Sequence, residues 1–192
     1  DVAIQGGDIT LISRDDGLNA AGGNDSSGTT GGRDGMFNDH GRMGNGMAAA
    51  SNGSVTISGG TVKIQASGDG IDANGSLTIS GGYTVITGPS QGDTATLDYD
   101  TTAVITGGTF LGTGASGMAQ TFSDSEQGVI SRNVGRQTAG TEINLIAPNG
   151  DVLVTYTPEM PFDVVIFSSP DIISGETYTI TVGTTSQECK AD

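Results

Sequence analysis

The stretch ISGGTVKIQASGDGIDANGSLTISGG, residues 57–82, begins and ends with the same Gly-Gly pair set among alternating apolar residues. Related versions occur as IQGGDI at 4–9, ISGGYTV at 79–85 and ITGGTF at 105–110. The second glycines of the four pairs follow one another at intervals of 53, 22 and 26 residues. The alternation predicts short strands, and the recurring interval predicts repeated units that stack to bury their apolar sides.

The first interval is longer than the second by 53 minus 22, or 31, residues. This difference matches a glycine-rich stretch at 22–52, which has no periodicity. We therefore expect one long, flexible insertion at 22–52 within the first repeat. It contains the one histidine, His40, which we expect to be a solvated loop residue rather than a metal ligand.

Repeats of about 22 residues, with short strands and glycine corners, are typical of a parallel β-helix, whose coils pair at about 4.8 Å. The leucine and asparagine ladder of a leucine-rich repeat is missing, and so is the period of about nine residues of a calcium β-roll. We predict an all-β chain in which residues 1–134 form a single-stranded parallel β-helix. In the third repeat, Tyr83 is expected to be an extra residue whose bulge turns Val85, instead of Thr84, toward the apolar column.

After residue 134 the repeat pattern ends. TEINLIAPNGDVLVTYTP predicts a hairpin about Asn149 and Gly150, and FDVVIFSSPDIISGETYTITVG predicts two more strands. We expect residues 135–185 to form a C-terminal β cap of antiparallel strands, which covers the exposed edge of the last coil. Residues 186–192 are expected to be a polar tail, with Cys189 a loose thiol that has no partner for an intrachain disulfide.

Acidic and amide residues recur at matching places in the repeats. Asp16 and Asn19 follow the second glycine of their Gly-Gly pair at the same distances as Asp69 and Asp72 follow theirs. Stacked repeats should therefore place these residues in columns. Asp72 and Asp98 precede the first glycine of the next Gly-Gly pair by the same number of residues. Asp98 is therefore expected to join the column of Asp72.

The same count aligns Asp100 with Asn74, whereas Ser116 and Ala119 interrupt the pattern in the fourth repeat. Carboxylates stacked about 4.8 Å apart repel by several kcal/mol at an effective dielectric constant near 20, and Ca²⁺ with its hard oxygen ligands would offset that repulsion. The alternative is that Asp and Asn simply stabilise the turns. We predict two or more Ca²⁺ ions held among the first three repeats, with these candidate ligands: Asp15, Asp16, Asn19, Asp69, Asp72, Asn74, Asp98 and Asp100.

The charge balance limits the partners. With 22 Asp and Glu against 7 Lys and Arg, the net charge is −15, which disfavours nucleic acid and anionic membrane surfaces and favours bound cations. An acidic polymer would need a bridging metal. No apolar run approaches the roughly 18 residues of a membrane span, so membrane insertion is not expected.

Candidate catalytic groups are few. The one histidine lies in the predicted insertion, so the sequence does not predict a catalytic triad of serine, histidine and carboxylate. For a lyase acting on an acidic sugar, Lys63 or Arg14 could remove a proton that calcium has acidified, although each is also explained as a surface charge. Tyr83 and Tyr99 are candidates to stack on a sugar ring, in a chain without tryptophan.

The combination of DDGLNAAGG at 15–23, SGDGIDANGSLTISGG at 67–82, LDYD at 97–100 and SGMAQ at 116–120 resembles a known family. It is the calcium-containing β-helical carbohydrate-binding domain family of Gram-positive polysaccharide-degrading bacteria, similar in fold to pectate lyases. The resemblance covers residues 1–183 approximately. The positions that match the acidic motifs of the family are Asp16, Asn19, Asp69, Asp72, Asp98 and Asp100.

This resemblance implies a right-handed β-helix with several bound Ca²⁺ ions and an extracellular or cell-surface location. It also implies binding of plant cell-wall polysaccharide, either cellulose or polygalacturonate and pectin, without a need for catalysis. The alternatives are a calcium-dependent pectate lyase and a structural cell-surface adhesin or stalk module.

Overall fold

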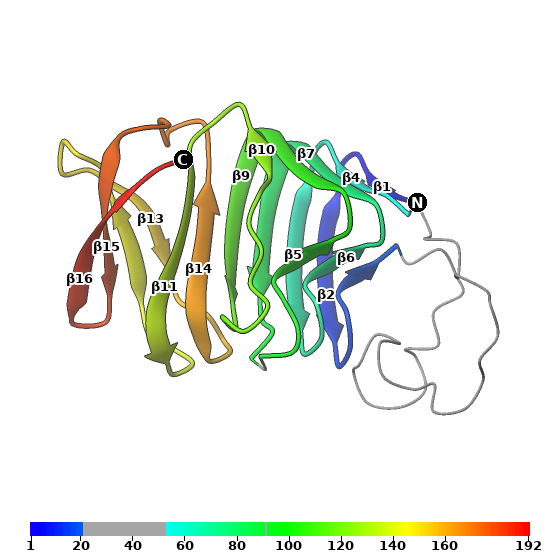
Figure 1. The fold of residues 1–192 in the computed structure, drawn as a ribbon, viewed down its shortest axis with the longest axis horizontal. Helices are drawn as coiled ribbons and strands as arrows, with labels where there is room; N and C mark the ends of the chain where they lie inside the picture. Colours follow the sequence, from blue (N-terminus) through cyan, green and yellow to red (C-terminus); the bar gives the residue numbers. More distant parts are fainter. Residues whose placement is uncertain (21–52, 91) are drawn as a thin grey trace, which may run out of the picture.

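The computed structural model describes residues 1–20, 53–90 and 92–192, so the predicted insertion at 22–52 lies outside the described residues. The described secondary structure consists of sixteen β-strands and no helix. Figure 1 shows that the strands stand side by side, broadly from β1 and β2 at the N-terminal end to β15 and β16 at the opposite end. The all-β prediction is confirmed, and the described part of the chain has no helix that could span a membrane.

Three parallel ladders make up the N-terminal part of the fold. The first joins β1 (Val2–Ile4), β4 (Val55–Ile57), β7 (Ser76–Thr87) and β9 (Thr102–Gly114). The second joins β2 (Asp8–Ser13), β5 (Thr61–Ala66) and the later part of β7. The third joins β3 (Leu18–Asn19), β6 (Ile71–Ala73) and β8 (Leu97–Tyr99). A short parallel strand, β10 (Asp124–Ser125), pairs with β9.

The sequence repeat coincides with the hydrogen-bonded register of the first ladder. Ile4 pairs with Ile57, Ile57 with Ile79, and Ile79 with Ile105. The last three of these side chains have no exposed surface. Because equivalent residues of neighbouring repeats pair directly, one apolar residue per repeat builds a continuous interior column.

The second glycine of every Gly-Gly pair has a structural reason, and so does the first glycine of each pair after the first repeat. The second glycine has a positive φ in every repeat, for example +86° at Gly60 and +85° at Gly82, a conformation that L side chains rarely adopt. The first glycine lies against the preceding repeat: a Cβ on Gly81 would lie 2.6 Å from the carbonyl oxygen of Ser58. The pair therefore makes a corner that lets successive repeats approach closely.

The expected bulge at Tyr83 is wrong. Tyr83 pairs with Thr61 and Thr84 pairs with Val62, so β5 and β7 match residue for residue. Thr84 is fully buried in the apolar column, and Val85 points to the other side of the strand, where it joins a second apolar cluster. The expectation failed because it assigned the buried position to the more apolar residue, whereas register decides which side chain points inward.

The strands after β10 are antiparallel and form two sets. The first contains β14 (Phe162–Ser168), which pairs with β9, and β11 (Val129–Gln137), which pairs with β14. The second is a four-stranded sheet in the order β13 (Val152–Tyr156), β12 (Ile143–Ile146), β15 (Thr177–Val182) and β16 (Thr185–Lys190). The predicted hairpin about Asn149 and Gly150 is confirmed by the pairing of β12 with β13.

Two predicted boundaries change. The antiparallel part begins with β11 at Val129, earlier than residue 135, because β11 is continuous across that point. The expected tail at 186–192 is mostly strand, since β16 pairs along its length with β15. Cys189 is consequently only 3% exposed and lies beside Tyr178, which makes it a core residue rather than a loose thiol.

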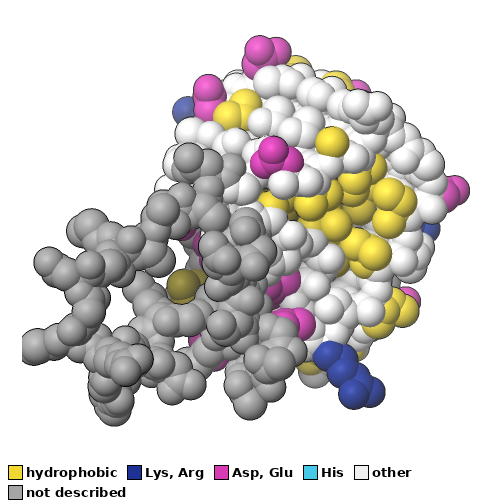
Figure 2. All heavy atoms as spheres, turned by 90° about the vertical axis from the view of Figure 1, so that its right-hand side faces the viewer, with side chains coloured by type: hydrophobic (Ala, Val, Ile, Leu, Met, Phe, Trp, Pro, Cys, Tyr) yellow, Lys and Arg dark blue, Asp and Glu magenta, His cyan; other side chains and the backbone are white. Residues whose placement is uncertain are grey.

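Two apolar clusters hold the fold together. The larger one fills the space between the three parallel ladders. The smaller one joins the outer side of β7 and β9 to the antiparallel strands through residues such as Val85, Leu111 and Phe167. At the N-terminal end, where β1, β2 and β3 are edge strands, Figure 2 shows apolar side chains gathered in one area with acidic side chains near it.

Candidate metal-binding columns and a separate cleft

The third ladder brings acidic and amide residues into register. Asn19 pairs with Asp72, and Asp72 with Asp98, one residue after the paired apolar positions of the same strands. The apolar neighbours Ile71 and Leu97 are fully buried, so alternation turns the polar side chains away from them. We call Asn19, Asp72 and Asp98 the Asp72 column. Its predicted register is confirmed.

A second set, the Asp16 column, consists of Asp16 and Asp69. The backbone N–H of Asp69 donates to Asp16 Oδ1 at 2.8 Å, and Asn19 Nδ2 donates to Asp16 Oδ2 at 2.8 Å. Asp69 Oδ1 in turn accepts from the backbone N–H of Ala95 in the next repeat. These carboxylates therefore stabilise turns, as the alternative expectation held. A carboxylate oxygen has two lone pairs, so a hydrogen bond to it does not by itself exclude a metal ion.

The glycines around Asp69 make this arrangement possible. A Cβ on Gly68 would lie 2.4 Å from Asp16 Oδ1, and a Cβ on Gly70 would lie 2.4 Å from the carbonyl oxygen of Thr96. Asp69 and Asp72 are only 4% and 3% exposed. The sequence SGDGID thus allows two carboxylates to be buried where neighbouring repeats touch.

Carboxylates repel one another around Asp98 in the Asp72 column. Burial raises the pKa of Asp98, and the charges of Asp100 and, more weakly, of Asp16 raise it further. Hydrogen bonds from the Tyr99 backbone and from Gln120 work in the opposite direction. The part of this shift that comes from neighbouring carboxylates is a repulsion that a bound cation would offset.

Gln120 extends the column into the fourth repeat, which sequence reasoning had missed. Its Nε2 donates to Asp98 Oδ1 at 3.1 Å. Ser116 and Ala119, which were expected to occupy this place, are exposed in the loop before it. A count of 22 residues from Asp98, the interval of the second and third repeats, would have found Gln120.

The remaining predicted ligands lie around these two columns. Asp15 is half-buried in the turn before Asp16, and its carbonyl oxygen accepts from the Gly68 N–H. Asn74 is half-buried and Asp100 is exposed, and the Asp100 N–H donates to the carbonyl oxygen of Ala73.

Within the described ranges, no three His, Cys, Asp or Glu side chains form a ready cluster of metal ligands. The available oxygens are of mixed type: carboxylates from neighbouring repeats, the amides of Asn19 and Asn74, and turn carbonyls. Ca²⁺ accepts all three kinds, whereas zinc prefers His and Cys. The residues present therefore fit Ca²⁺ better than zinc.

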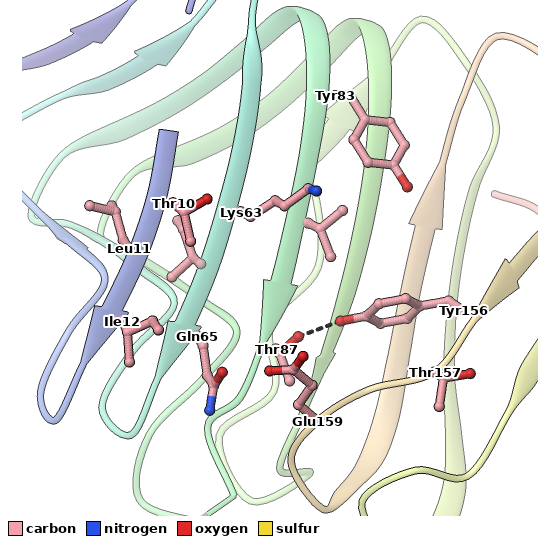
Figure 3. A pocket seen from close by; sticks show the side chains of 12 residues that line it. Thr10, Leu11, Ile12, Lys63, Gln65, Tyr83, Thr87, Tyr156, Thr157 and Glu159 are labelled. Carbon is pink, nitrogen blue, oxygen red and sulfur yellow. Dashed lines mark hydrogen bonds between the residues drawn. The ribbon is translucent and has the colours of Figure 1, made fainter. Parts of the chain in front are cut away.

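A cleft of about 480 Å³ lies elsewhere, on the outer side of the second ladder. Figure 3 shows Lys63 and Gln65 of β5 and Tyr83 of β7 on one side, with Tyr156 of β13 and Glu159 of the loop after β13 on the other. The hydroxyl groups of Tyr156 and Thr87 form a hydrogen bond across the cleft. Burial raises the pKa of Tyr156, as does the charge of Glu159, so its phenol remains protonated at neutral pH.

The candidate catalytic and sugar-stacking residues are divided between these regions. Lys63 points outward, as predicted, but into the cleft with Tyr83. Arg14 is exposed in the turn that precedes the Asp16 column. Tyr99 packs against the interior cluster and its hydroxyl donates to the carbonyl oxygen of Thr121 at 2.7 Å, a position that favours a structural role over sugar stacking.

Sequence reasoning missed the other side of the cleft. Tyr156 lies 69 residues from Thr87 and belongs to a different sheet. Neither Tyr156 nor Glu159 is part of a repeat, so no periodic signal connects them with β5 and β7.

Comparisons with protein-family models, with curated proteins and with solved structures gave no match.

Proposed function

We propose that this chain is a calcium-dependent carbohydrate-binding domain for plant cell-wall polysaccharide, acting outside the cell or at its surface. We also propose that its parallel repeats form a right-handed parallel β-helix of the kind found in the carbohydrate-binding family that the sequence resembles. The observation that carries the proposal is the Asp72 column, in which Asn19, Asp72 and Asp98 pair across three successive repeats.

Electrostatics supports calcium as the link to an acidic ligand. The chain has a net charge of −15, and Asp98 lies among other carboxylates that raise its pKa. A polygalacturonate chain would be repelled by such a surface. Bound Ca²⁺ would supply positive charge at the columns and bridge protein and uronate carboxylates. The chain's own residues would hold the ion through Asp16, Asp69 and the Asp72 column.

A calcium-dependent pectate lyase is the second candidate, and one observation favours it. Arg14 is exposed directly before Asp15 and Asp16, where a base could reach a sugar held at the columns. The other candidate base, Lys63, lies in the separate cleft, whose one described carboxylate is that of Glu159.

The test is retention on insoluble polygalacturonate and cellulose, with Ca²⁺ and with chelator. We expect retention on polygalacturonate that requires Ca²⁺ and is weakened in Asp98→Asn. Asp171→Asn serves as the control, because it makes the same change of charge at an exposed aspartate in the C-terminal part, away from the columns.

The same samples separate the alternatives. Unsaturated product that depends on Ca²⁺ and is lost in Arg14→Ala would establish the lyase. Retention on neither polymer under any condition would overturn carbohydrate binding and leave a structural adhesin or stalk.

A further inference from the structure

The cleft between Tyr83 and Tyr156 has the features of a second ligand site. We propose that it binds an uncharged sugar unit of a polysaccharide, without calcium. This inference rests on the proposed carbohydrate-binding function, and it assigns neutral ligands to a place distinct from the Asp16 and Asp72 columns.

Size and lining agree with a sugar ring. The volume of about 480 Å³ is within the usual range for small-molecule sites. Tyr83 is 40% exposed and offers an aromatic face, while the rest of the lining mixes hydroxyl, amide and charged groups with apolar patches. A pyranose presents the same mixture, since it has an apolar C–H face and a rim of hydroxyl groups.

The charges of the cleft balance. Lys63 and Glu159 both line it, yet the ion pair found in the described part of the chain joins Arg136 and Asp163 instead. Figure 3 shows the Lys63 amine directed toward Tyr83 and the Glu159 carboxylate beside Thr87. An amine that donates and a carboxylate that accepts can together bind neighbouring sugar hydroxyls.

The same balance argues against two other ligand classes. A uronate would gain from Lys63 but would be repelled by Glu159 and by the acidic protein as a whole. A peptide that adds a strand would pair with a free sheet edge, here that of β2 at one end of the cleft, whereas between Lys63 and Tyr83 the cleft lies over β5 and β7, which are already paired on both sides.

The back wall is held in place before a ligand arrives. The Tyr156 hydroxyl is fixed by Thr87, and Val85 beneath them is only 8% exposed because it packs into the smaller apolar cluster. A preformed wall reduces the ordering cost of binding.

The experiment is a titration with the neutral pentasaccharides of cellulose, xylan and mannan, and with oligogalacturonate. Binding is followed by calorimetry and by amide chemical shifts at a temperature where the chelator-treated chain is folded. We expect at least one neutral oligosaccharide to bind equally with Ca²⁺ and with chelator and to shift amides of β5 and β7. Tyr83→Ala should weaken binding of that oligosaccharide roughly tenfold, which corresponds to a loss of about 1.4 kcal/mol in binding free energy.

The controls separate this site from the columns. Val152→Ala removes a side chain that is 57% exposed outside the cleft and should leave binding unchanged. Asp98→Asn should weaken retention on polygalacturonate and leave the neutral oligosaccharide bound.

Three outcomes would overturn the inference. In the first, the folded chain would bind no neutral oligosaccharide, and in the second, Tyr83→Ala and the native chain would bind one with the same affinity. In the third, oligogalacturonate would displace the neutral ligand from the cleft. None of these would affect calcium-dependent retention on polygalacturonate, which tests the proposed function separately.

Discussion

Single residues at the corners decide how closely the repeats approach. Gly6 and Gly81 are both the first glycine of a Gly-Gly pair, but only Gly81 has a repeat before it. A Cβ would have open space at Gly6 and would lie 2.6 Å from the Ser58 carbonyl oxygen at Gly81.

We predict that Gly81→Ala lowers the free energy of unfolding by roughly 1–3 kcal/mol, the usual cost of overpacking. Gly6→Ala, the matched control, should change it by less than about 0.5 kcal/mol. Urea unfolding followed by circular dichroism measures both. Equal effects of the two substitutions would show that contact between repeats is not what requires glycine.

Thr84 is a polar residue in an apolar column. It is fully buried, and among the described residues its Oγ1 has no hydrogen-bond partner. An unsatisfied buried hydroxyl costs roughly 1–3 kcal/mol on the evidence of protein mutations.

Thr84→Val keeps the shape and removes that hydroxyl, so we predict that it raises the free energy of unfolding by about 1 kcal/mol. Thr87→Val on the same strand is the control. Thr87 is also buried, but its hydroxyl is bonded to Tyr156, and its loss should destabilise. If Thr84→Val destabilised as much as Thr87→Val, the Thr84 hydroxyl must have a partner in solution.

At the scale of elements, the third ladder joins structure to electrostatics. The pKa of Asp98 is raised above its ordinary value of 3.8 by burial and by nearby carboxylates. In the metal-free chain the protonated carboxyl therefore stabilises the fold below about pH 4, and this contribution is lost as pH rises through the raised value.

Asp98→Asn should consequently have opposite effects in two conditions. In chelator at pH 7, we predict that it raises the free energy of unfolding, because a neutral amide removes the repulsion. In Ca²⁺ it should lower the free energy of unfolding, because a carboxylate ligand is lost. Thermal unfolding at pH 7, in chelator and in Ca²⁺, checks both signs, and a variant less stable than the native chain in chelator would show that the Asp98 charge is not disfavoured.

The elements also show what the sequence could predict. The register of Asn19, Asp72 and Asp98 was predictable, because pairing between repeats converts a constant interval in the chain into contact in space. The position of Gln120 was less accessible, since no Gly-Gly pair follows it to provide a reference for counting. The cleft was not predictable at all, because Tyr156 meets Thr87 only through packing between two sheets.

At the scale of the whole molecule, the two ends of the ladders differ in whether their edges are paired. At the N-terminal end, β1, β2 and β3 are edge strands. The C-terminal edge of β9 is paired by β14 and then by β11, which protects it in the way expected of a cap. In between, acidic columns and a charge-balanced cleft lie on different ladders. On the proposed function, the columns would supply calcium-dependent contacts to a polysaccharide and the cleft would supply calcium-independent ones.

We propose that the Asp16 and Asp72 columns bind Ca²⁺ in the folded chain. The most direct measurement is thermal unfolding followed by circular dichroism, with excess Ca²⁺ and with chelator. At a Ca²⁺ concentration 100 times the dissociation constant, one site adds about 2.7 kcal/mol, which raises the midpoint by roughly 5–11 °C for a chain of this length. We predict a rise of at least that order, and the same midpoint in Ca²⁺ and in chelator would contradict the account.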